Sequence, residues 1–128
     1  QIKVRHVMNR DVLAIKQQAL CAEAVETFLR HNVAALPVIT PSREVVGILS
    51  QTDLLFKPHL QQTVGTVATR QVVVLHQDCT VLKAVKLFQE KKLRCIPVVD
   101  RRKKLVGMLT RRDMLAYFYR NYDRFVAP

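Results

Sequence analysis

Two short segments place a hydroxyl group three positions before a carboxylate. Ser50 precedes Asp53 in "SQTD", and Thr110 precedes Asp113 in "TRRD". At the start of a helix, this spacing is typical of a capping box, in which both side chains bond first-turn amides. The same groups can also bind a ligand, because a carboxylate accepts two hydrogen bonds from a ribose diol and helix N-terminal amides attract phosphate. Capping and ligand binding both fit the pattern.

The two segments differ in charge. Between the hydroxyl and the acid, the first has Gln51 and Thr52, whereas the second has Arg111 and Arg112. A guanidinium group donates two hydrogen bonds at once and therefore suits phosphate. The arginines fit a solvated helix start as well. If the segments form two nucleotide sites, we expect unequal sites, one favouring a phosphorylated ligand and the other weaker or empty.

A glycine occupies the same place before each of these hydroxyl groups. Gly47 and Gly107 are two of the three glycines in the chain. A glycine here allows the close approach of a ligand to the backbone. A β-bulge would also favour glycine. The position therefore indicates a backbone constraint of one of these two kinds.

Both segments belong to an internal repeat. When residues 1–60 are aligned with residues 61–120 without gaps, sixteen positions are identical, including Pro37 with Pro97. Such self-similarity indicates two copies of one structural unit. We therefore divide the chain into repeat 1 (1–60), repeat 2 (61–120) and an aromatic-rich C-terminal extension (121–128).

Each repeat shows the same order of expected elements. Short β-branched segments predict buried strands, and apolar residues at helical spacing, which include Leu29 and Leu82, predict amphipathic helices. The order is strand, helix, strand, strand, helix. The expected ranges are 12–15, 21–32, 36–40, 45–50 and 51–60 in repeat 1, and 72–75, 81–92, 96–100, 105–110 and 111–120 in repeat 2.

The connections between these elements predict a topology. A strand–helix–strand step favours parallel pairing, and two strands joined by a short polar turn favour an antiparallel hairpin. Because a sixty-residue unit is marginal alone, we expect the two small sheets to pack against each other. We also expect a helical turn in the lead segments 3–8 and 64–69, helix caps at Asp78 and Thr80, and an early helix end at Pro58.

Two segments depart from the repeat. The basic "RRKK" of residues 101–104 replaces "PSRE" and predicts a solvated hairpin tip, or a surface for an acidic partner or membrane. The end of repeat 2 is rich in aromatic side chains, which predicts packing on its own core or across a dimer, or a docking surface. These aromatic residues are Tyr117, Phe118, Tyr119, Tyr122 and Phe125.

The repeated unit resembles the CBS domain, named after cystathionine β-synthase, and the tandem pair resembles a Bateman module. The resemblance rests on "NVAALPVI" and "KLRCIPVV", and on "VVGILSQTDLL" and "LVGMLTRRDML", and it covers residues 2–119. It implies an α/β fold of two β-α-β-β-α repeats, packed through their small sheets with pseudo-two-fold symmetry. It also implies a homodimer that binds adenosine-containing ligands between the repeats and regulates a parent enzyme, channel or transporter.

The resemblance also implies roles for individual residues. Asp53 and Asp113 correspond to acids that bind ribose, with the hydroxyls of Ser50 and Thr110 beside them. Phosphate contacts are implied for Arg94, Arg111 and Arg112; at the position of Arg94, repeat 1 has Ala34. A backbone and adenine pocket is implied for Val12, Val72, Ala35, Leu36, Pro37, Cys95, Ile96 and Pro97. The implied ligands are AMP, ADP, ATP and S-adenosylmethionine.

The net charge of +11 favours an anionic partner. A nucleotide phosphate satisfies this preference, whereas a nucleic acid is less expected because no recognition helix or stacking platform is evident. No nucleophile–base pattern indicates an enzyme, so we expect no catalytic residues. A ligand-free module for dimerisation or protein interaction is the main alternative.

The cysteines and the hydropathy indicate the cellular setting. Cys21, Cys79 and Cys95 have no paired spacing, which favours free thiols in a reducing compartment. The histidines are scattered and no metal motif occurs, so we expect no metal. Apolar runs fall short of the ~18 residues of a membrane helix. We expect a cytoplasmic location, either free or as part of a membrane protein, and a chain cut from a longer one.

Overall fold

The computed structural model describes residues 1–56 and 60–122. Repeat 1 contains the 3-10 helix η1 (Val4–His6), β1 (Ile15–Lys16), α1 (Cys21–Arg30), β2 (Ala35–Ile39), β3 (Val45–Ser50) and α2 (Gln51–Phe56). Repeat 2 contains α3 (Val64–Val67), β4 (Leu75–His76), α4 (Val81–Glu90), β5 (Cys95–Val99), β6 (Leu105–Thr110) and α5 (Arg111–Arg120). The predicted order of elements is confirmed in both halves. Pro58 lies outside the described residues.

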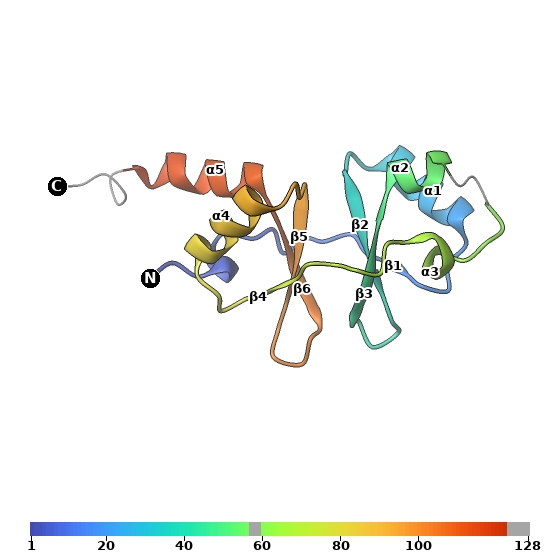
Figure 1. The fold of residues 1–128 in the computed structure, drawn as a ribbon, viewed down its shortest axis with the longest axis horizontal. Helices are drawn as coiled ribbons and strands as arrows, with labels where there is room; N and C mark the ends of the chain where they lie inside the picture. Colours follow the sequence, from blue (N-terminus) through green and yellow to red (C-terminus); the bar gives the residue numbers. More distant parts are fainter. Residues whose placement is uncertain (57–59, 123–128) are drawn as a thin grey trace.

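Two three-stranded sheets form the middle of the molecule (Figure 1). In each sheet the first strand is parallel to the second, and the third strand is antiparallel to it, as predicted. The helices lie on the outer sides of the sheets (Figure 1). None of the described helices combines the length and the hydrophobicity that a membrane span requires.

The first strand of each half is shorter than predicted. β1 begins at Ile15 and β4 at Leu75, whereas the sequence predicted strands from residues 12 and 72. Among the described residues, the backbone N–H and C=O of Val12 have no hydrogen-bond partner. Because these groups are not paired in a sheet, residues 12–14 approach β1 as an irregular segment.

The lead segments are exchanged between the halves. In Figure 1, η1 lies beside α4 of the second half, and α3 lies beside β1 of the first half. The Val4 N–H donates to the Cys79 carbonyl at 2.8 Å, and the Val64 N–H donates to the Ala19 carbonyl at 2.7 Å. The packed halves are therefore not the same segments as the sequence repeats, because each half contains the lead segment of the other repeat.

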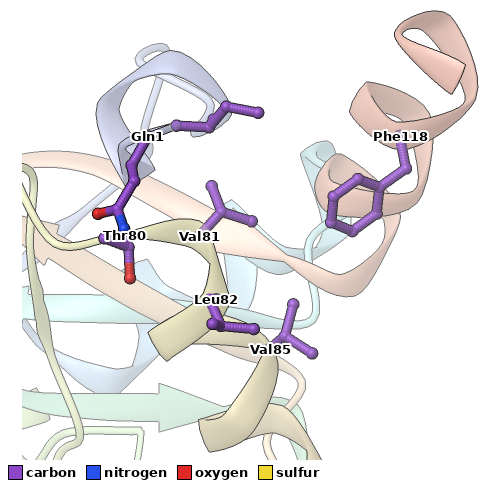
Figure 2. Close-up of a pocket in the computed structure, with 7 residues that line it drawn as sticks. Gln1, Thr80, Val81, Leu82, Val85 and Phe118 are labelled. Carbon is purple, nitrogen blue, oxygen red and sulfur yellow. The ribbon is translucent and has the colours of Figure 1, made fainter. Parts of the chain in front are cut away.

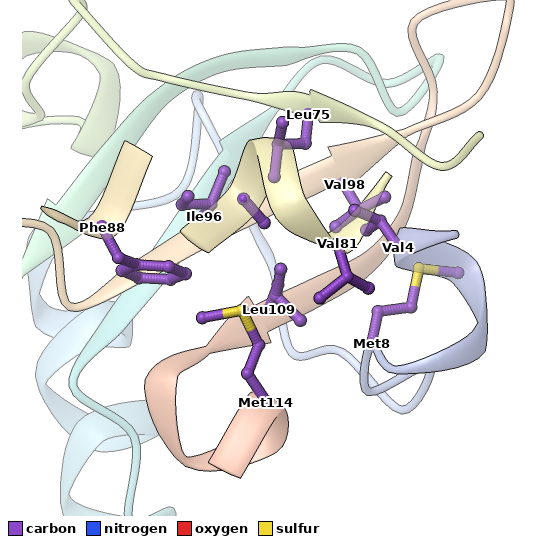
Figure 3. Close-up of a cluster of buried hydrophobic side chains, with 10 residues drawn as sticks. Val4, Met8, Leu75, Val81, Phe88, Ile96, Val98, Leu109 and Met114 are labelled. Carbon is purple, nitrogen blue, oxygen red and sulfur yellow. The ribbon is translucent and has the colours of Figure 1, made fainter. Parts of the chain in front are cut away.

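Each half has its own hydrophobic core, completed by the exchanged segment. Val64 and Val67 of α3 enter the first core, whereas Val4 and Met8 enter the second (Figure 3). Burying these side chains gives each half apolar contacts that it lacks alone. The first core contains Ile15, Cys21, Ala24, Phe28, Leu36, Val38, Leu49, Leu54, Val64 and Val67. The second contains Val4, Met8, Leu75, Val81, Ala84, Phe88, Ile96, Val98, Leu109 and Met114.

The residues just before the lead segments satisfy amides at the helix starts. The Cys21 N–H of α1 donates to the Gln62 carbonyl, and the Val81 N–H of α4 donates to the Ile2 carbonyl. The Thr80 hydroxyl caps α4 by accepting from the Lys83 N–H at 3.3 Å, which confirms the predicted cap.

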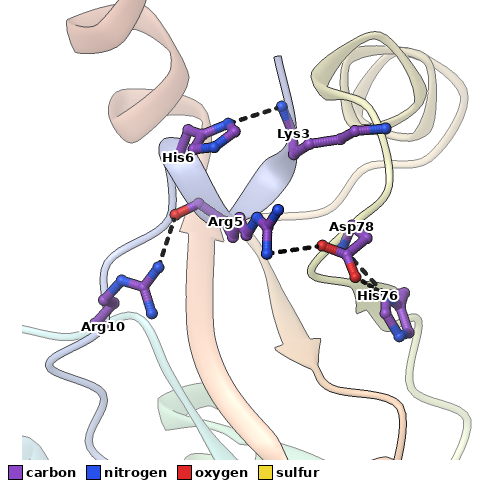
Figure 4. Close-up of polar contacts among 6 residues, drawn as sticks. All are labelled: Lys3, Arg5, His6, Arg10, His76 and Asp78. Atoms are coloured by element: carbon purple, nitrogen blue, oxygen red, sulfur yellow. Dashed lines mark hydrogen bonds and ion pairs between the residues drawn. The ribbon is translucent and has the colours of Figure 1, made fainter. Parts of the chain in front are cut away.

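Asp78, which we also expected to cap α4, has a different role. Its Oδ1 lies 3.3 Å from Nη1 of Arg5 in the lead segment, and its backbone N–H donates to Nδ1 of His76 (Figure 4). Thr80, which lies directly before α4, occupies the cap position. Asp78 therefore helps to hold η1 on the second half.

Two leucines expected on the buried faces of helices are exposed. The exposed fraction is 83% for Leu29 of α1 and 65% for Leu82 of α4. The buried stripe of α1 is narrower than predicted and consists of Cys21, Ala24 and Phe28. Leu29 follows Phe28 by one residue, which is a turn of about 100° on a helix, and therefore faces away from the sheet.

The tips of the two hairpins lie together, because the Leu105 N–H donates to the Arg43 carbonyl at 2.9 Å. "RRKK" forms a turn at the second tip, as predicted. Oδ1 of Asp100 accepts from the amides of Arg102 and Lys104 there. The turn is thus fixed by Asp100, while Arg101, Arg102 and Lys103 are exposed.

Candidate functional site

Both "SQTD" and "TRRD" form capping boxes at a strand-to-helix junction. In the second half, the Asp113 N–H donates to the Thr110 hydroxyl at 3.0 Å, and the Thr110 N–H donates to Oδ2 of Asp113 at 2.9 Å. The corresponding distances for Ser50 and Asp53 are 3.2 and 2.9 Å. The structural interpretation of the motif is therefore correct for both copies.

The cap engages only part of the Asp113 carboxylate. Oδ2 accepts the Thr110 N–H, whereas Oδ1 has no hydrogen-bond partner among the described residues. Asp113 and Thr110 are both partly exposed. The carboxylate can therefore cap α5 through one oxygen and bind a ligand through the other.

Asp113 lines a cleft of about 330 Å³ between the two halves, which we call the Asp113 cleft. One wall comes from the segment before β1 and the loop before β2, and the other from β5, β6 and the start of α5. The lining residues are Asn9, Asp11, Val12, Leu13, Asn32, Val33, Ala34, Ala35, Arg94, Cys95, Met108, Thr110, Arg112 and Asp113. This volume lies in the range of small-molecule sites.

The Asp113 cleft brings together several of the residues predicted for ligand binding. These are Thr110, Asp113, Arg94, Arg112, Val12, Ala35 and Cys95. Four others, Leu36, Pro37, Ile96 and Pro97, lie fully buried in the central strands β2 and β5. Leu36 and Ile96 belong to the two hydrophobic cores, and none of the four side chains lines this cleft. Val72 and Asp53 do not line it either.

A second cleft of about 580 Å³ surrounds Ser50, and we call it the Ser50 cleft. It begins at the N-terminus of α2 and shares one wall with the Asp113 cleft. Its lining residues are Asn32, Val33, Ala34, Ser50, Gln51, Thr52, Leu55 and Arg94. Asn32, Val33, Ala34 and Arg94 line both clefts.

The two clefts differ in their charged groups. Arg94 and Arg112 line the Asp113 cleft together with Asp11 and Asp113. In the described part of the chain, Arg94 is the only charged residue that lines the Ser50 cleft. The Asp113 cleft therefore offers both an acceptor for hydroxyl groups and two donors for phosphate.

Arg111 is placed differently from its neighbour Arg112. Nη2 of Arg111 donates to the Leu93 carbonyl at 3.0 Å. Gln51, its counterpart in repeat 1, likewise donates through Nε2 to the Val33 carbonyl at 3.2 Å. Both side chains brace the loop before a central strand, and Arg111 does not line the Asp113 cleft.

The two glycines make room for the exchanged lead segments. A Cβ atom at Gly47 would lie 2.9 Å from the Thr69 carbonyl oxygen, and one at Gly107 would meet the side chain of Met8. Each sheet also has a register shift here, because Val38 pairs with Gly47 and Ile39 with Val45. The close approach expected at these positions is that of another chain segment, and the bulge is present too.

Cys95 lines the Asp113 cleft as a thiol. Burial raises the pKa of this thiol, and the Arg94 guanidinium beside it acts in the opposite direction. A raised pKa keeps the thiol protonated near neutral pH and lowers its nucleophilicity. Among the described residues, no group of three His, Cys, Asp or Glu side chains is placed to hold a metal ion. The cleft offers polar and charged groups that can bind a ligand.

The sequence did not single out half of the residues that line the Asp113 cleft. Asn9, Asp11 and Leu13 come from the lead segment and its connection to β1. The Asn9 N–H donates to the Met108 carbonyl, and the Met108 N–H donates back to Asn9, both at 2.9 Å. This pairing of distant segments places the wall, and the sequence carries no local signal for it.

Comparisons with known proteins agree with this architecture. A family model described as the CBS domain matches twice, at residues 4–59 and 64–120. The crystal structure of CBSX2 in complex with AMP is 27% identical, with a TM-score of 0.86 over 95% of this chain and 99% of that chain. The structure of the CBS-pair protein CBSX2 from Arabidopsis thaliana is 26% identical, with the same TM-score over 94% of this chain and 96% of that one.

A similar curated sequence belongs to a much longer protein. The inosine-5'-monophosphate dehydrogenase of Methanocaldococcus jannaschii is 26% identical over 113 residues. The match covers 88% of this chain and 23% of the dehydrogenase. The chain thus spans about a quarter of that enzyme.

Proposed function

This chain belongs to the CBS domain family, and we propose that it is a regulatory module that binds an adenosine nucleotide in the Asp113 cleft. One observation carries the proposal, namely that a carboxylate, a hydroxyl and two arginines from different elements line one cleft between the halves. Each group matches a part of AMP, ADP or ATP. S-adenosylmethionine lacks the phosphate that the arginines suit, and we therefore rank it below the nucleotides.

The ribose suits the negative carboxylate of the cleft, and the phosphate suits its positive arginines. Asp113 Oδ1, which the cap leaves without a partner, can accept hydrogen bonds from the ribose diol. Arg112 and Arg94 can donate to phosphate oxygens. The start of α5 adds the positive end of a helix dipole, which favours an anion near Arg112.

The adenine base fits the irregular segment before β1. Val12 is half-buried and lines the cleft, and its backbone N–H and C=O have no partner among the described residues. Half-buried backbone groups favour a hydrogen-bonding partner. The edge of adenine offers one acceptor and one donor, which a free N–H and a free C=O can bond. The binding of AMP by CBSX2, a relative of nearly equal length, supports this choice of ligand.

We propose that ligand binding regulates a larger protein rather than catalysing a reaction. The match to a dehydrogenase covers only 23% of that enzyme, so its catalytic activity does not extend to this chain. A parent enzyme, channel or transporter in the cytoplasm would fit the free thiols of Cys21, Cys79 and Cys95.

A second copy of the chain is the partner that we propose for the exposed apolar side chains. Leu29 and Leu55 of the first half are 83% and 76% exposed, and Leu115 and Tyr119 of α5 are 70% and 83% exposed. Both ends of the molecule thus present exposed apolar side chains on their helices. An apolar cavity of about 450 Å³ lies at one end, between α4 and Phe118 of α5 (Figure 2). Phe125 lies outside the described residues.

The main alternative is a dimerisation or interaction module without a ligand. The capping boxes favour it, because they explain Ser50, Asp53, Thr110 and Asp113 without any bound molecule. The alternative does not explain why the arginines concentrate at one of the two equivalent boxes. We therefore rank it second.

Calorimetric titration of the chain with AMP, ADP, ATP and S-adenosylmethionine, with adenosine as the reference that lacks a phosphate, tests the proposed function. We expect at least one of the three nucleotides to bind, and to bind more tightly than adenosine, because the arginines contact the phosphate. Circular dichroism confirms that the protein is folded under the same conditions. If the folded protein binds none of these four ligands, the result contradicts nucleotide binding and favours the ligand-free module.

A further inference from the structure

Arg94 lies where the two clefts meet. It precedes β5 and lines both the Asp113 cleft and the Ser50 cleft. Its side chain is exposed, and no hydrogen bond or ion pair holds its guanidinium group among the described residues. The guanidinium can therefore turn toward either cleft.

The equivalent position of repeat 1 carries no charge. Ala34 is the counterpart of Arg94, is also exposed, and also lines both clefts. Two equivalent arginines would give each cleft its own cation at this shared wall. With Ala34 in place of one of them, the two clefts have a single cation in common.

The two clefts depend on this cation to different extents. The Asp113 cleft also contains Arg112, whereas no other cation among the described residues lines the Ser50 cleft. A phosphate in the Ser50 cleft would therefore rely on Arg94 alone. A phosphate in the Asp113 cleft would engage Arg94 together with Arg112.

We infer that the two clefts share Arg94, so that a phosphorylated ligand in the Asp113 cleft weakens the binding of a second one in the Ser50 cleft. This inference rests on the proposed function. A guanidinium group that bonds one phosphate is withdrawn from the other, and the second phosphate adds a like charge nearby. The coupling is reciprocal, as it is for any two linked binding sites. The module therefore holds one phosphorylated ligand per chain more tightly than a second one.

Counting the AMP molecules bound per chain tests the inference, with AMP as the probe in calorimetry and equilibrium dialysis. We expect one AMP per chain, with any second AMP at least about tenfold weaker, since a hydrogen bond to a charged group contributes that much or more. The variant Ala34→Arg supplies the missing cation and is expected to bind a second AMP at least about tenfold more tightly than the parent chain. Ala34→Gln adds a long polar side chain without charge, and this variant should still bind one AMP per chain.

Three results would overturn the inference. These results are equal affinity of the parent chain for two AMP molecules, binding of only one AMP by Ala34→Arg, and binding of a second AMP by Ala34→Gln. Since residue 34 is exposed, neither substitution disturbs a core. If no variant binds AMP, ADP or ATP, the proposed function itself fails and the inference falls with it. Equal binding of two AMP molecules leaves the proposed function intact.

Discussion

The two halves of the molecule have the same backbone fold, but their clefts contain different charged side chains. Ser50–Asp53 and Thr110–Asp113 form capping boxes whose hydrogen-bond lengths differ by at most 0.2 Å. Yet the cleft at Asp113 contains both Arg94 and Arg112, whereas Arg94 is the only cation that lines the cleft at Ser50 among the residues that the structure describes. The repeated motif thus forms the same helix cap in each half, and we propose that the charged residues in and near it set the ligand preference of each cleft.

The same contrast appears between Arg111 and Arg112. Arg111 repeats the structural contact of Gln51, because both side chains donate to the carbonyl of the loop before a central strand. Arg112 replaces Thr52 and lines the Asp113 cleft. Arg111 therefore keeps a structural contact that both halves share, whereas Arg112 adds a charge that the first half lacks at the equivalent position.

The largest effect that we expect is a loss of stability when an equivalent core leucine is replaced in either half. Leu49 and Leu109 are equivalent and fully buried, and replacing either with Ala should lower the free energy of unfolding by about 3 kcal/mol. Because each core contains the lead segment of the other repeat, both variants should unfold in one transition. Urea denaturation followed by circular dichroism measures this. Two separate transitions, with only one shifted by each substitution, would show that the halves are independent.

We expect a smaller effect on the affinity for AMP, and we expect it to differ between Arg112 and Arg111. Arg112→Gln should lower the affinity for AMP about 10- to 100-fold, because a charge-assisted contact to phosphate is lost. The affinity for adenosine, which has no phosphate, should change little. Arg111→Gln removes the same charge and serves as the matched control, and it should leave the affinity for AMP nearly unchanged. Calorimetry compares them, and equal losses in both variants would indicate general charge attraction instead.

The sequence was sufficient to predict the elements and their pairing. Short β-branched segments, the polar turn at 101–104 and the hydroxyl–carboxylate spacing at Thr110 and Asp113 are local signals, and each predicted the type of feature that is found, although β1 and β4 begin three residues later than expected. The duplication strengthened every assignment, because a weak signal in one repeat was supported by its counterpart.

The exchange of the lead segments could not be predicted in this way. Val4 and Val64 match as apolar residues in the repeat, but nothing in their sequence shows which core they enter. Their partners are backbone carbonyls of Cys79 and Ala19, and any residue can supply such an acceptor. The wall of the Asp113 cleft that contains Asn9 and Asp11 follows from this exchange, and for this reason the sequence did not identify it.

Some of the pocket residues expected from the resemblance line the cleft, whereas others are buried in the cores. Val12, Ala35 and Cys95 line the Asp113 cleft, whereas Leu36 and Ile96 are fully buried in the cores. Side chains in a strand alternate between two faces, so adjacent residues of β2 and β5 have different surroundings. The roles of these residues in binding remain proposals that the affinities of variants can test.

The most direct test of nucleotide binding at Asp113 compares Asp113→Asn with Asp53→Asn. Asparagine retains an acceptor for the cap but removes the negative charge and one acceptor for the ribose diol. We predict that Asp113→Asn lowers the affinity for both AMP and adenosine about tenfold, with a single thermal unfolding transition retained. Asp53→Asn should leave the affinity of the main AMP site unchanged. If both variants bind AMP as the parent chain does and differ only in melting temperature, the motif is a helix cap alone and the account is contradicted.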